Sequence, residues 1–264
     1  MSTAATTTID PTVRRIPPRG GFNRRVLRIE LLRMVRNRRT VAFTMIFPAG
    51  LYFAITGSDT TWDTPVGSGN EAAYILISMA LYGAALIAAA SGAMVATERA
   101  LGWSRQLRLT PLNPVAYVTM KALVALAMGA LAIAVVNACG VLQGRAEMPG
   151  RVWLEAGAIT LCCTLTFAAL GVFIGYIVPG DNAMQLLGPG LALLSFLGGV
   201  FWPLTEGSGL WHVAVFTPMY GVAEVARSPL THELPWYALV NGVGWLAVFV
   251  AGAAWRMSKD TARV

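Results

Sequence analysis

Six long apolar stretches without any charged side chain recur along this 264-residue chain. Each is about as long as the roughly 20 helical residues that cross a hydrocarbon core about 30 Å thick. A charge at the centre of such a helix costs about 2.5–3.5 kcal/mol on insertion, so a membrane protein has a reason to exclude it there. The pattern predicts an all-α polytopic membrane protein with six transmembrane helices: Thr40–Ser58, Ala72–Thr97, Ala122–Gly144, Ala156–Gly180, Asn182–Thr205 and Leu234–Trp255.

A seventh charge-free run, Gly207–Ala223, is short and is broken by glycines and Pro218. Counting it as a crossing would place the basic C-terminal tail on the side opposite to the other basic segments. We therefore predict that 201–235 forms a re-entrant or interfacial element between the fifth and sixth spans. Its aromatic side chains would anchor it at the level of the lipid headgroups: Trp202, Trp211, Tyr220 and Trp236.

The composition supports a membrane domain, because 56% of the residues are hydrophobic and only 12% are charged. That charged fraction is about half of what soluble proteins carry. Cys139, Cys162 and Cys163 all fall inside predicted spans and have neither disulfide-framework nor metal-site spacing, so we expect them to be small buried hydrophobic residues.

The basic residues lie before the first span, between the second and third spans, and in the C-terminal tail. All but three of the 20 lysines and arginines belong to these segments, the exceptions being Arg145, Arg151 and Arg227. The positive-inside rule then predicts that both termini are cytoplasmic and that 59–71 and 206–233 lie outside the cell membrane. Anionic lipid of the inner leaflet accounts for the basic charge, and no nucleic-acid partner is needed.

Four regions are expected along the chain. Residues 1–21 form a disordered cytoplasmic tail, and 22–39 form an interfacial helix whose stripe of Leu27, Leu31 and Met34 faces away from the arginines. A basic topology signal without a binding role is the alternative for that segment. Residues 40–256 form the six-span domain, and 257–264 form a second cytoplasmic tail.

The loop after the second span combines basic and apolar side chains. Thr97–Leu109 can form a short helix that Pro111 ends, and Asn113 can then cap a new helix that begins at Pro114. The apolar side chains of this loop exceed what a purely solvated loop needs, which favours a docking element over a solvated loop: Leu101, Trp103, Leu107 and Leu109.

Two local patterns concern helix packing. Asp181 and Asn182 can cap the fifth span directly after the fourth, so these two spans should form an antiparallel hairpin. Pairs of glycines four residues apart permit close helix contact, and they are Gly140 with Gly144 and Gly171 with Gly175.

Several chemistries are excluded by the sequence. The only lysines are Lys121 and Lys259, and no phosphate-binding loop motif occurs, so the chain has no such route to ATP hydrolysis. His212 and His232 both lie in the predicted outer segment, away from the membrane interior. No predicted span interior carries the ionisable residue that proton- or sodium-driven transporters need. The energy source for transport, if there is one, must therefore come from elsewhere.

Three segments together resemble the permease subunit of ABC-2 type exporters, the family that includes daunorubicin-resistance and sodium-efflux permeases. They are the Arg-rich helix before the first span, the loop between the second and third spans, and the segment 198–203 with Thr217-Pro218. The loop is the most specific, and its matching positions are Glu98, Arg99, Gly102, Arg105, Leu107, Leu109, Thr110 and Pro111.

The resemblance implies a transport subunit that is not itself an enzyme. Two copies of a separate ATPase would bind ATP and Mg, while this chain binds no cofactor or metal. A second permease, identical or paralogous, would complete a dimer that exports a small amphipathic drug, antibiotic or lipid-like substrate, as in multidrug efflux. The loop would be a coupling helix in a groove of the ATPase, with Glu98, Arg99, Gly102, Arg105 and Arg108 as coupling residues.

The transport path is expected along the second and fifth spans, where adaptable or aromatic side chains suit an amphipathic substrate. Contact with lipid or with other helices is the alternative for each of these residues. The path candidates are Met79, Tyr82, Met94, Gln185, Phe196 and Phe201, and Trp202, Pro203 and Pro218 would belong to the re-entrant segment.

Three other functional classes remain as alternatives. An ion-coupled secondary transporter would be favoured by a buried carboxylate, which the span pattern does not provide. A membrane-embedded enzyme would need a nucleophile and a base close together. A non-transporting structural subunit is disfavoured by the apolar and basic surface of the loop.

Overall fold

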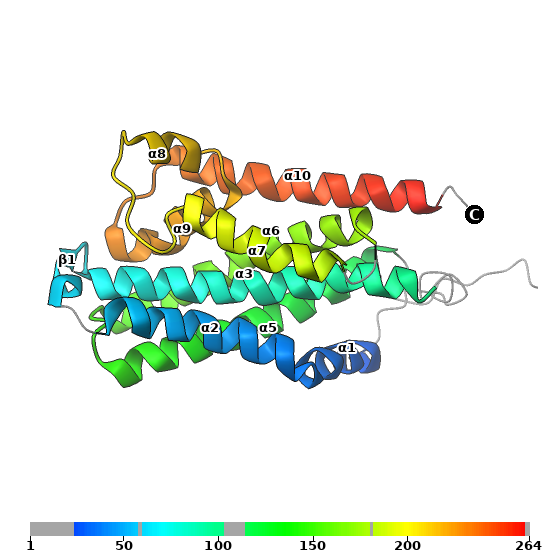
Figure 1. Ribbon diagram of the computed structural model, residues 1–264, viewed down its shortest axis with the longest axis horizontal. Helices are drawn as coiled ribbons and strands as arrows, with labels where there is room; N and C mark the ends of the chain where they lie inside the picture. Colours follow the sequence, from blue (N-terminus) through cyan, green and yellow to red (C-terminus); the bar gives the residue numbers. More distant parts are fainter. Residues whose placement is uncertain (1–23, 58–59, 103–113, 180–181, 262–264) are drawn as a thin grey trace, which may run out of the picture.

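The computed structural model describes residues 24–57, 60–102, 114–179 and 182–261. Long helices run side by side along one axis, with α1 at one end and the short elements β1, α8 and α9 at the other (Figure 1). We call these the basic end and the hairpin end. The helices are α1 (Arg24–Arg36), α2 (Arg38–Thr56), α3 (Glu71–Ala100), α5 (Pro114–Gln143), α6 (Gly150–Ile177), α7 (Asn182–Leu197), α8 (Gly209–Ala214), α9 (Pro218–Thr231) and α10 (Trp236–Thr261).

Five helices of the described residues are long and apolar enough to cross a membrane: α2, α3, α5, α6 and α10. Each overlaps one of the predicted spans, and Pro114 begins α5 as the sequence predicted. The remaining predicted span, the fifth, contains α7, an apolar helix of 16 residues that is shorter than the others. A polytopic helical membrane protein is therefore confirmed, with five long spans and one shorter apolar helix.

The fifth predicted span, 182–205, is too long, because α7 ends at Leu197. Gly199 adopts a left-handed conformation with φ of 67°, and the N–H of Val200 donates to the carbonyl of Ser195 at 3.0 Å. This is the hydrogen-bonding pattern of a Schellman cap, which ends a helix where a glycine can take positive φ. At about 1.5 Å per residue, α7 reaches about 24 Å.

Helix α3 is the centre of the bundle. In its most apolar 18-residue window 94% of the residues are buried, against 17% in α10. It packs against α2, α5, α6, α7 and α9. A displacement of α3 would therefore change its contacts with most of the other helices.

Small residues allow α3 and α6 to approach closely. The Cβ of an alanine at Gly92 would overlap the backbone of α6 at Ala168 and Val172, and one at Gly171 would overlap the backbone of Ala89. Gly175 also faces the α3 backbone. The predicted pair of Gly171 and Gly175 thus lies at a close helix contact.

The second glycine pair behaves differently. Gly140 lies against the side chain of Leu76, whereas a Cβ at Gly144 would meet nothing within 4 Å. Gly144 follows the end of α5 with φ of 74°, so its role is in the turn rather than in helix packing.

Helix α1 lies within the segment predicted as an interfacial helix, 22–39, and it ends three residues before that segment does. Helix α1 ends at Arg36, and the side chain of Asn37 accepts a hydrogen bond from the N–H of Thr40 as α2 begins. The predicted stripe packs onto the protein: Met34 is buried, and Leu27 and Leu31 contact the cluster of Met45, Ile87 and Met128.

The opposite side of α1 carries Val26, Ile29, Leu32 and Val35, which are all exposed. This second apolar strip is the one available to lipid.

The predicted C-terminal tail, 257–264, begins as a continuation of the last helix. Helix α10 continues to Thr261, so most of the predicted tail 257–264 is helical. Lys259 lies over the ring of Trp255 at 3.8 Å, and Arg256 lies at 5.3 Å from the same ring. These cation–π contacts stabilise the last turns of the helix.

The hairpin end is built from short elements between the long helices. After the turn η2 (Thr60–Asp63), strands β1 (Pro65–Val66) and β2 (Gly69–Asn70) pair antiparallel, a small departure from the predicted all-α fold. The N–H of Ser68 donates to the carbonyl of Leu230 at 2.9 Å, so this hairpin contacts the C-terminal end of α9.

Asn70 connects the same hairpin to the loop between α5 and α6. Its side chain accepts from the N–H of Ala73 at 2.9 Å, which caps α3. The same side chain donates to the carbonyl of Arg145 at 2.8 Å and accepts from the N–H of Glu147 at 3.1 Å. One buried amide therefore satisfies backbone groups of two segments.

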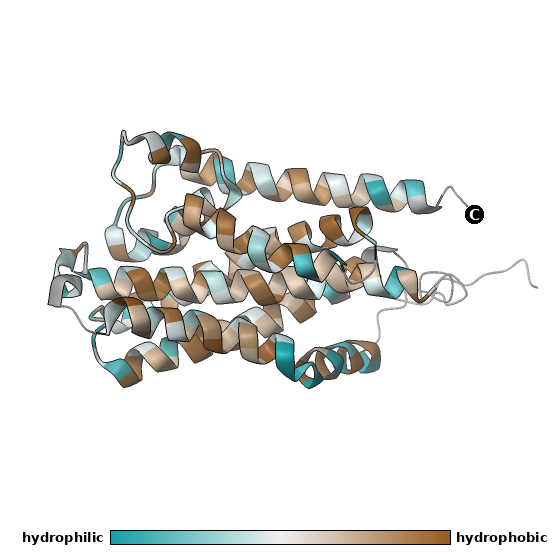
Figure 2. Ribbon diagram, viewed as in Figure 1, coloured by the Kyte–Doolittle hydropathy of each residue, from teal (hydrophilic) through white to brown (hydrophobic). Residues whose placement is uncertain are grey.

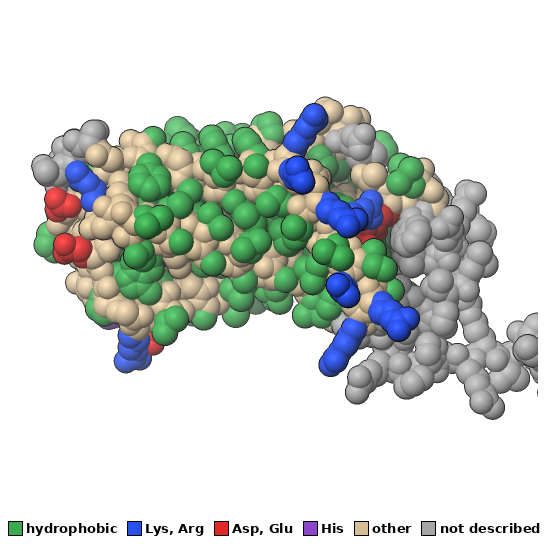
Figure 3. Space-filling model, turned by 90° about the horizontal axis from the view of Figure 1, so that it is seen from below, with side chains coloured by type: hydrophobic (Ala, Val, Ile, Leu, Met, Phe, Trp, Pro, Cys, Tyr) green, Lys and Arg blue, Asp and Glu red, His purple; other side chains and the backbone are tan. Residues whose placement is uncertain are grey.

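The surface agrees with a bilayer environment. The hydropathy colouring shows apolar residues along the long helices and hydrophilic ones on α1 (Figure 2). Hydrophobic side chains cover the middle of the face drawn in Figure 3, and most lysines and arginines of that face lie near the basic end. An apolar belt with charges at its ends is typical of a membrane-spanning bundle.

Candidate functional site

Glu98, which the sequence predicts as an exposed coupling residue, is buried in the last turns of α3. Only 3% of the residue is exposed. Helix α3 does not end before Glu98 but continues to Ala100, which turns the carboxylate toward α1 and α5 instead of toward solvent. The expectation that Glu98 is exposed on a separate short helix is therefore wrong.

A cluster of five polar side chains from three helices surrounds this carboxylate, and we call it the Glu98 cluster: Glu30 and Arg33 of α1, Glu98 of α3, and Tyr117 and Lys121 of α5. Lys121 Nζ lies 2.5 Å from Glu98 Oε1 and 3.0 Å from Glu30 Oε2. Arg33 Nη1 lies 3.2 Å from Glu98 Oε1, and the Tyr117 hydroxyl donates to Glu98 Oε2.

The Glu98 cluster is neutral in sum, with two carboxylates and two cations. The side chains of Lys121 and Glu98 are only 5% and 4% exposed, whereas that of Arg33 is 40% exposed. Burying an unpaired ion costs several kcal/mol, so the buried ions Lys121 and Glu98 depend on their partners. The charges therefore hold α1, α3 and α5 in one arrangement.

Arg99 occupies the next position of α3 and contacts α6. Its Nη1 donates to the carbonyls of Gly175 at 3.3 Å and Tyr176 at 3.0 Å, and its guanidinium lies 5.2 Å from the ring centre of Tyr176. The last carbonyls of α6 lack partners within that helix, and an arginine satisfies them. Arg99 therefore binds the end of α6, which does not test its predicted role toward an ATPase.

The remaining predicted coupling residues follow the end of α3 in the sequence. Gly102 has φ of 71° directly after α3, while Arg105 and Arg108 lie outside the described residues. Since α3 ends at Ala100 and α5 begins at Pro114, both ends of this loop start within a few residues of the Glu98 cluster.

Sequence reasoning did not identify Glu30, Arg33, Tyr117 or Lys121 as functional. One signal was present, because Glu30 is the only acidic residue between Asp10 and Asp59, within an arginine-rich segment. Tyr117 and Lys121 are four residues apart and hence share one helix face.

A second buried charge lies at the hairpin end. Arg227 of α9, which the sequence places in the outer segment, is only 1% exposed. Its Nε donates to the Ser78 hydroxyl at 2.9 Å, and its Nη1 donates to the Tyr74 hydroxyl at 2.7 Å. A cation therefore lies against α3, although no span contains a charge in its own interior.

Two further contacts complete the Arg227 network. Nη2 donates to the carbonyl of Gly199 at 2.7 Å, and Nη1 lies 3.1 Å from Glu224 Oε1. The guanidinium also stacks at 4.1 Å from the ring centre of Tyr74. The Arg227 network thus connects α9, α3 and the turn after α7.

A family model described as "ABC-2 type transporter" matches residues 23–231, which is most of the chain and includes both charge networks. The chain belongs to the ABC-2 type transporter family. A protein of Bacillus subtilis (strain 168), named "Putative transport permease YvfS", is 28% identical over 177 residues, or 66% of this chain and 71% of that protein.

Membership confirms the predicted resemblance and identifies the chain as a multi-pass membrane permease rather than an enzyme. Permeases of this family normally work with an ABC ATPase partner. The predicted resemblance rests on three separate segments. The family match is continuous over 23–231 and therefore also covers the five helices between those segments, α2, α3, α5, α6 and α7.

The structure distributes the predicted path residues of the permease over several places. Tyr82 is buried in α3, and its ring packs edge-on against Phe201 at 5.4 Å and Phe47 at 6.4 Å. Phe196, 46% exposed, packs edge-on against Trp202 at 4.3 Å. Aromatic side chains of α2, α3 and the segment after α7 therefore form one continuous group.

The other path candidates do not join that group. Met79 is fully buried in the main core, Met94 packs on the smaller cluster near α1, and Gln185 is exposed on α7. The structure therefore brings only some of these residues together, and their role in transport stays a prediction.

The re-entrant candidates and the cysteines can also be placed. Trp202 and Pro203 follow the end of α7, and Pro218 is the buried first residue of α9, capped by Thr217. Burial and the nearby Glu224 raise the pKa of the Tyr220 phenol, whose oxygen accepts from Trp211 Nε1 at 3.1 Å. The prediction of buried cysteines is wrong for Cys162, which is exposed on α6, while Cys139 and Cys163 are partly buried.

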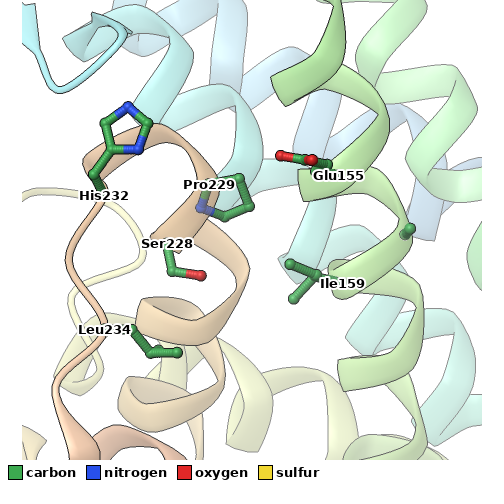
Figure 4. A pocket seen from close by; sticks show the side chains of 7 residues that line it. Glu155, Ile159, Ser228, Pro229, His232 and Leu234 are labelled. Carbon is green, nitrogen blue, oxygen red and sulfur yellow. The ribbon is translucent and has the colours of Figure 1, made fainter.

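An open groove of about 500 Å³ lies between α6 and α9 at the hairpin end (Figure 4). Its lining combines Glu155, Ser228 and His232 with apolar residues such as Ile159 and Pro229. Glu155 is already paired with Arg151 at 2.6 Å. The groove contains none of the predicted path residues, so it is a surface depression separate from the aromatic group.

Proposed function

We propose that this chain is the membrane-spanning subunit of an ATP-driven exporter, assembled from two permeases and two copies of a separate ATPase that binds ATP and Mg. The second permease is another copy or a paralogue. The observation that carries the proposal is the Glu98 cluster, because it lies at both ends of the loop whose sequence resembles the family's coupling helix. The Glu98 cluster would transmit a movement of that loop to the helices of the bundle.

The Glu98 cluster gives Glu98 a different role from the one first expected. A buried carboxylate that is bound by Arg33, Tyr117 and Lys121 does not dock on another subunit. It makes α1, α3 and α5 respond together when the loop is displaced. Since α3 contacts five other helices, movement at its basic end reaches most of the bundle.

The residues that would contact the ATPase are then those of the loop itself. Arg105 and Arg108 are three residues apart and share one face if the loop is helical. Arg99 anchors the same region to α6, and Gly102 directly after α3 has a positive φ that ends the helical path. These residues would transmit the closing of the ATPase dimer to the spans.

The orientation follows from charge. The basic end would face the cytoplasm, where the ATPase and anionic lipid are, and the hairpin end would lie outside the cell membrane. The exposed strip of Ile29 and Val35 on α1 suits a helix that rests on the inner leaflet.

The substrate would be a small amphipathic molecule such as a drug, an antibiotic or a lipid. The aromatic group around Tyr82 and Phe201 supports this class, because polarizable rings contact varied apolar shapes without requiring one geometry. Exposed Phe43, Phe47 and Phe196 extend the same surface on α2 and α7.

The test compares the purified chain with a complex containing its ATPase. The chain alone should not hydrolyse ATP, and the complex should hydrolyse it at a rate that changes on reconstitution into lipid. Arg105→Glu and Arg108→Glu should reduce recovery of the ATPase or separate hydrolysis from efflux, because charge reversal in a complementary interface replaces attraction with repulsion. Arg151→Glu, at an exposed arginine of the hairpin end, is the matched control.

Wild-type recovery and efflux in both loop variants, at equal membrane expression, would withdraw the coupling role of these arginines. Robust hydrolysis by the isolated chain would refute the proposal as a whole.

An ion-coupled secondary transporter is a second candidate, favoured by one observation. The structure contains a buried carboxylate, Glu98, where the span pattern had provided none. Full pairing of that carboxylate at the end of the bundle argues against a proton relay. Efflux from vesicles driven by a proton gradient, with no ATPase present, would favour this candidate.

A further inference from the structure

Arg227 is the largest side chain that is fully buried among the described residues. Its four hydrogen-bonding contacts reach Ser78 and Tyr74 of α3, Glu224 of its own helix, and the carbonyl of Gly199. The stack on the Tyr74 ring fixes the plane of the guanidinium as well. Few rotations of the side chain keep all these contacts at once.

The charge of Arg227 is only partly balanced. Glu224 is the carboxylate that pairs with it, and that side chain is 21% exposed, whereas Arg227 is 1% exposed. The remaining partners are neutral oxygens. An arginine keeps its charge at any ordinary pH, so its burial is tolerable only while these oxygens stay in place.

The contact with Gly199 holds the C-terminal end of α7, a helix with one buried face and one exposed face. Helix α7 exposes Leu186, Leu193 and Phe196 on one side, at 53%, 60% and 46%. Its end is the Schellman turn at Gly199, whose carbonyl points to Arg227 instead of continuing a helix. A shift of α7 along or around its axis would therefore break this hydrogen bond.

Apolar packing alone would let α7 shift gradually against its neighbours. Leucine or methionine side chains can slide past one another over several ångströms with gradual loss of contact, because dispersion is not directional. Hydrogen bonds weaken steeply with distance and angle. A shift of α7 would therefore break the bond between Arg227 and Gly199 abruptly rather than weaken it gradually.

We propose that Arg227 is a latch that holds the hairpin end of the permease closed, and that its release from Gly199 accompanies outward opening. The latch joins α9, α3 and the end of α7 when engaged. It rests on the proposed function, because opening is expected only if the ATPase drives a transport cycle. Arg227 is a positioning residue in this scheme and does not need to touch the substrate.

Hydrogen–deuterium exchange of the purified complex measures the latch directly. The peptides to follow cover 195–204 and α9, with and without ATP plus orthovanadate, which traps the ATPase after hydrolysis. In the wild-type complex we expect slow exchange without nucleotide and exchange at least tenfold faster in the trapped state. Peptides in the centre of α3 should change little.

Arg227→Met removes the hydrogen bonds and keeps much of the side-chain length. It should give fast exchange in both peptides without nucleotide and little further change on trapping. Arg227→Lys keeps the charge but cannot reach all four partners, so it should lie between Met and wild type. Arg151→Met, at an exposed arginine of the same end, should match wild type.

Two milder variants keep the test decisive if Arg227→Met does not fold. Tyr74→Phe and Ser78→Ala each remove one hydrogen bond and leave the arginine in place. Each should raise exchange at 195–204 by a few fold, and the pair together by more than either alone.

Wild-type exchange in folded Arg227→Met, or in the double variant, would overturn the proposal that these bonds hold the end closed. Slow exchange of the wild-type complex in the trapped state, with hydrolysis intact, would show a static contact and would also overturn it. Absence of a complex with the ATPase would instead refute the proposed function, and is seen before any exchange is measured.

Discussion

Lys121→Met tests whether the Glu98 cluster holds the basic end together. The change removes one cation and keeps a similar chain length, so packing of the α5 face should be little affected. Glu98 then loses Lys121 Nζ, which lies 2.5 Å from its Oε1, and keeps Arg33 at 3.2 Å and the Tyr117 hydroxyl. Glu30 loses its contact with Lys121 at 3.0 Å.

The magnitude follows from burial. Removing one partner of a buried ion pair costs about 3–5 kcal/mol, because the other ion is left uncompensated. Glu98 is 4% exposed but keeps the half-exposed Arg33, so we expect the lower limit, about 3 kcal/mol. At roughly 2–4 °C per kcal/mol for a chain of this size, the melting temperature should fall by roughly 6 °C or more.

The assay is thermal unfolding of the purified permease in detergent, followed by loss of monodisperse protein. Arg151→Met is the matched control, since Arg151 also pairs with a glutamate but is 84% exposed, and it should leave the melting temperature unchanged. The double variant Glu98→Gln with Lys121→Met should recover more than half of the loss, because it removes the orphaned charge.

A melting temperature of wild-type value in Lys121→Met would refute the reasoning. So would a double variant whose loss equals the sum of the two single losses, because the two groups would then not interact.

Two further predictions concern packing and topology. Gly92→Ala should destabilise the permease, because its Cβ would overlap the α6 backbone at Ala168 and Val172, while Gly50→Ala on α2, where a Cβ meets nothing within 4 Å, should be neutral or slightly stabilising in the same unfolding assay. Equal melting temperatures for both variants would contradict the close contact between α3 and α6. A cysteine at position 258, in a chain lacking Cys139, Cys162 and Cys163, should not react with an impermeant maleimide from outside intact cells, and reaction there would reverse the proposed orientation of α10.

The sequence was sufficient for the positions of the long helices. The bilayer excludes charge from each span separately. Each span can therefore be recognised from its own residues, whatever helices it packs against. Pro114 and Asn182 likewise begin α5 and α7 through local backbone preference. The end of α7 was missed because the charge pattern continues past Gly199, although the two glycines and Pro203 were local signals of a stop.

Only the tertiary structure decided what the charged residues do. In sequence, Glu98 and Arg227 are charges outside the predicted spans, and such charges are normally exposed. Their partners are far along the chain, since Lys121 and Arg33 lie 23 and 65 positions from Glu98, and Tyr74 lies 153 positions from Arg227. Whether a charge is solvated or buried and paired depends on which helices the fold brings against it, and apolar helices without charge can pack in several orders. The charge pattern therefore determined the membrane class, while helix packing determined which charges became the two networks.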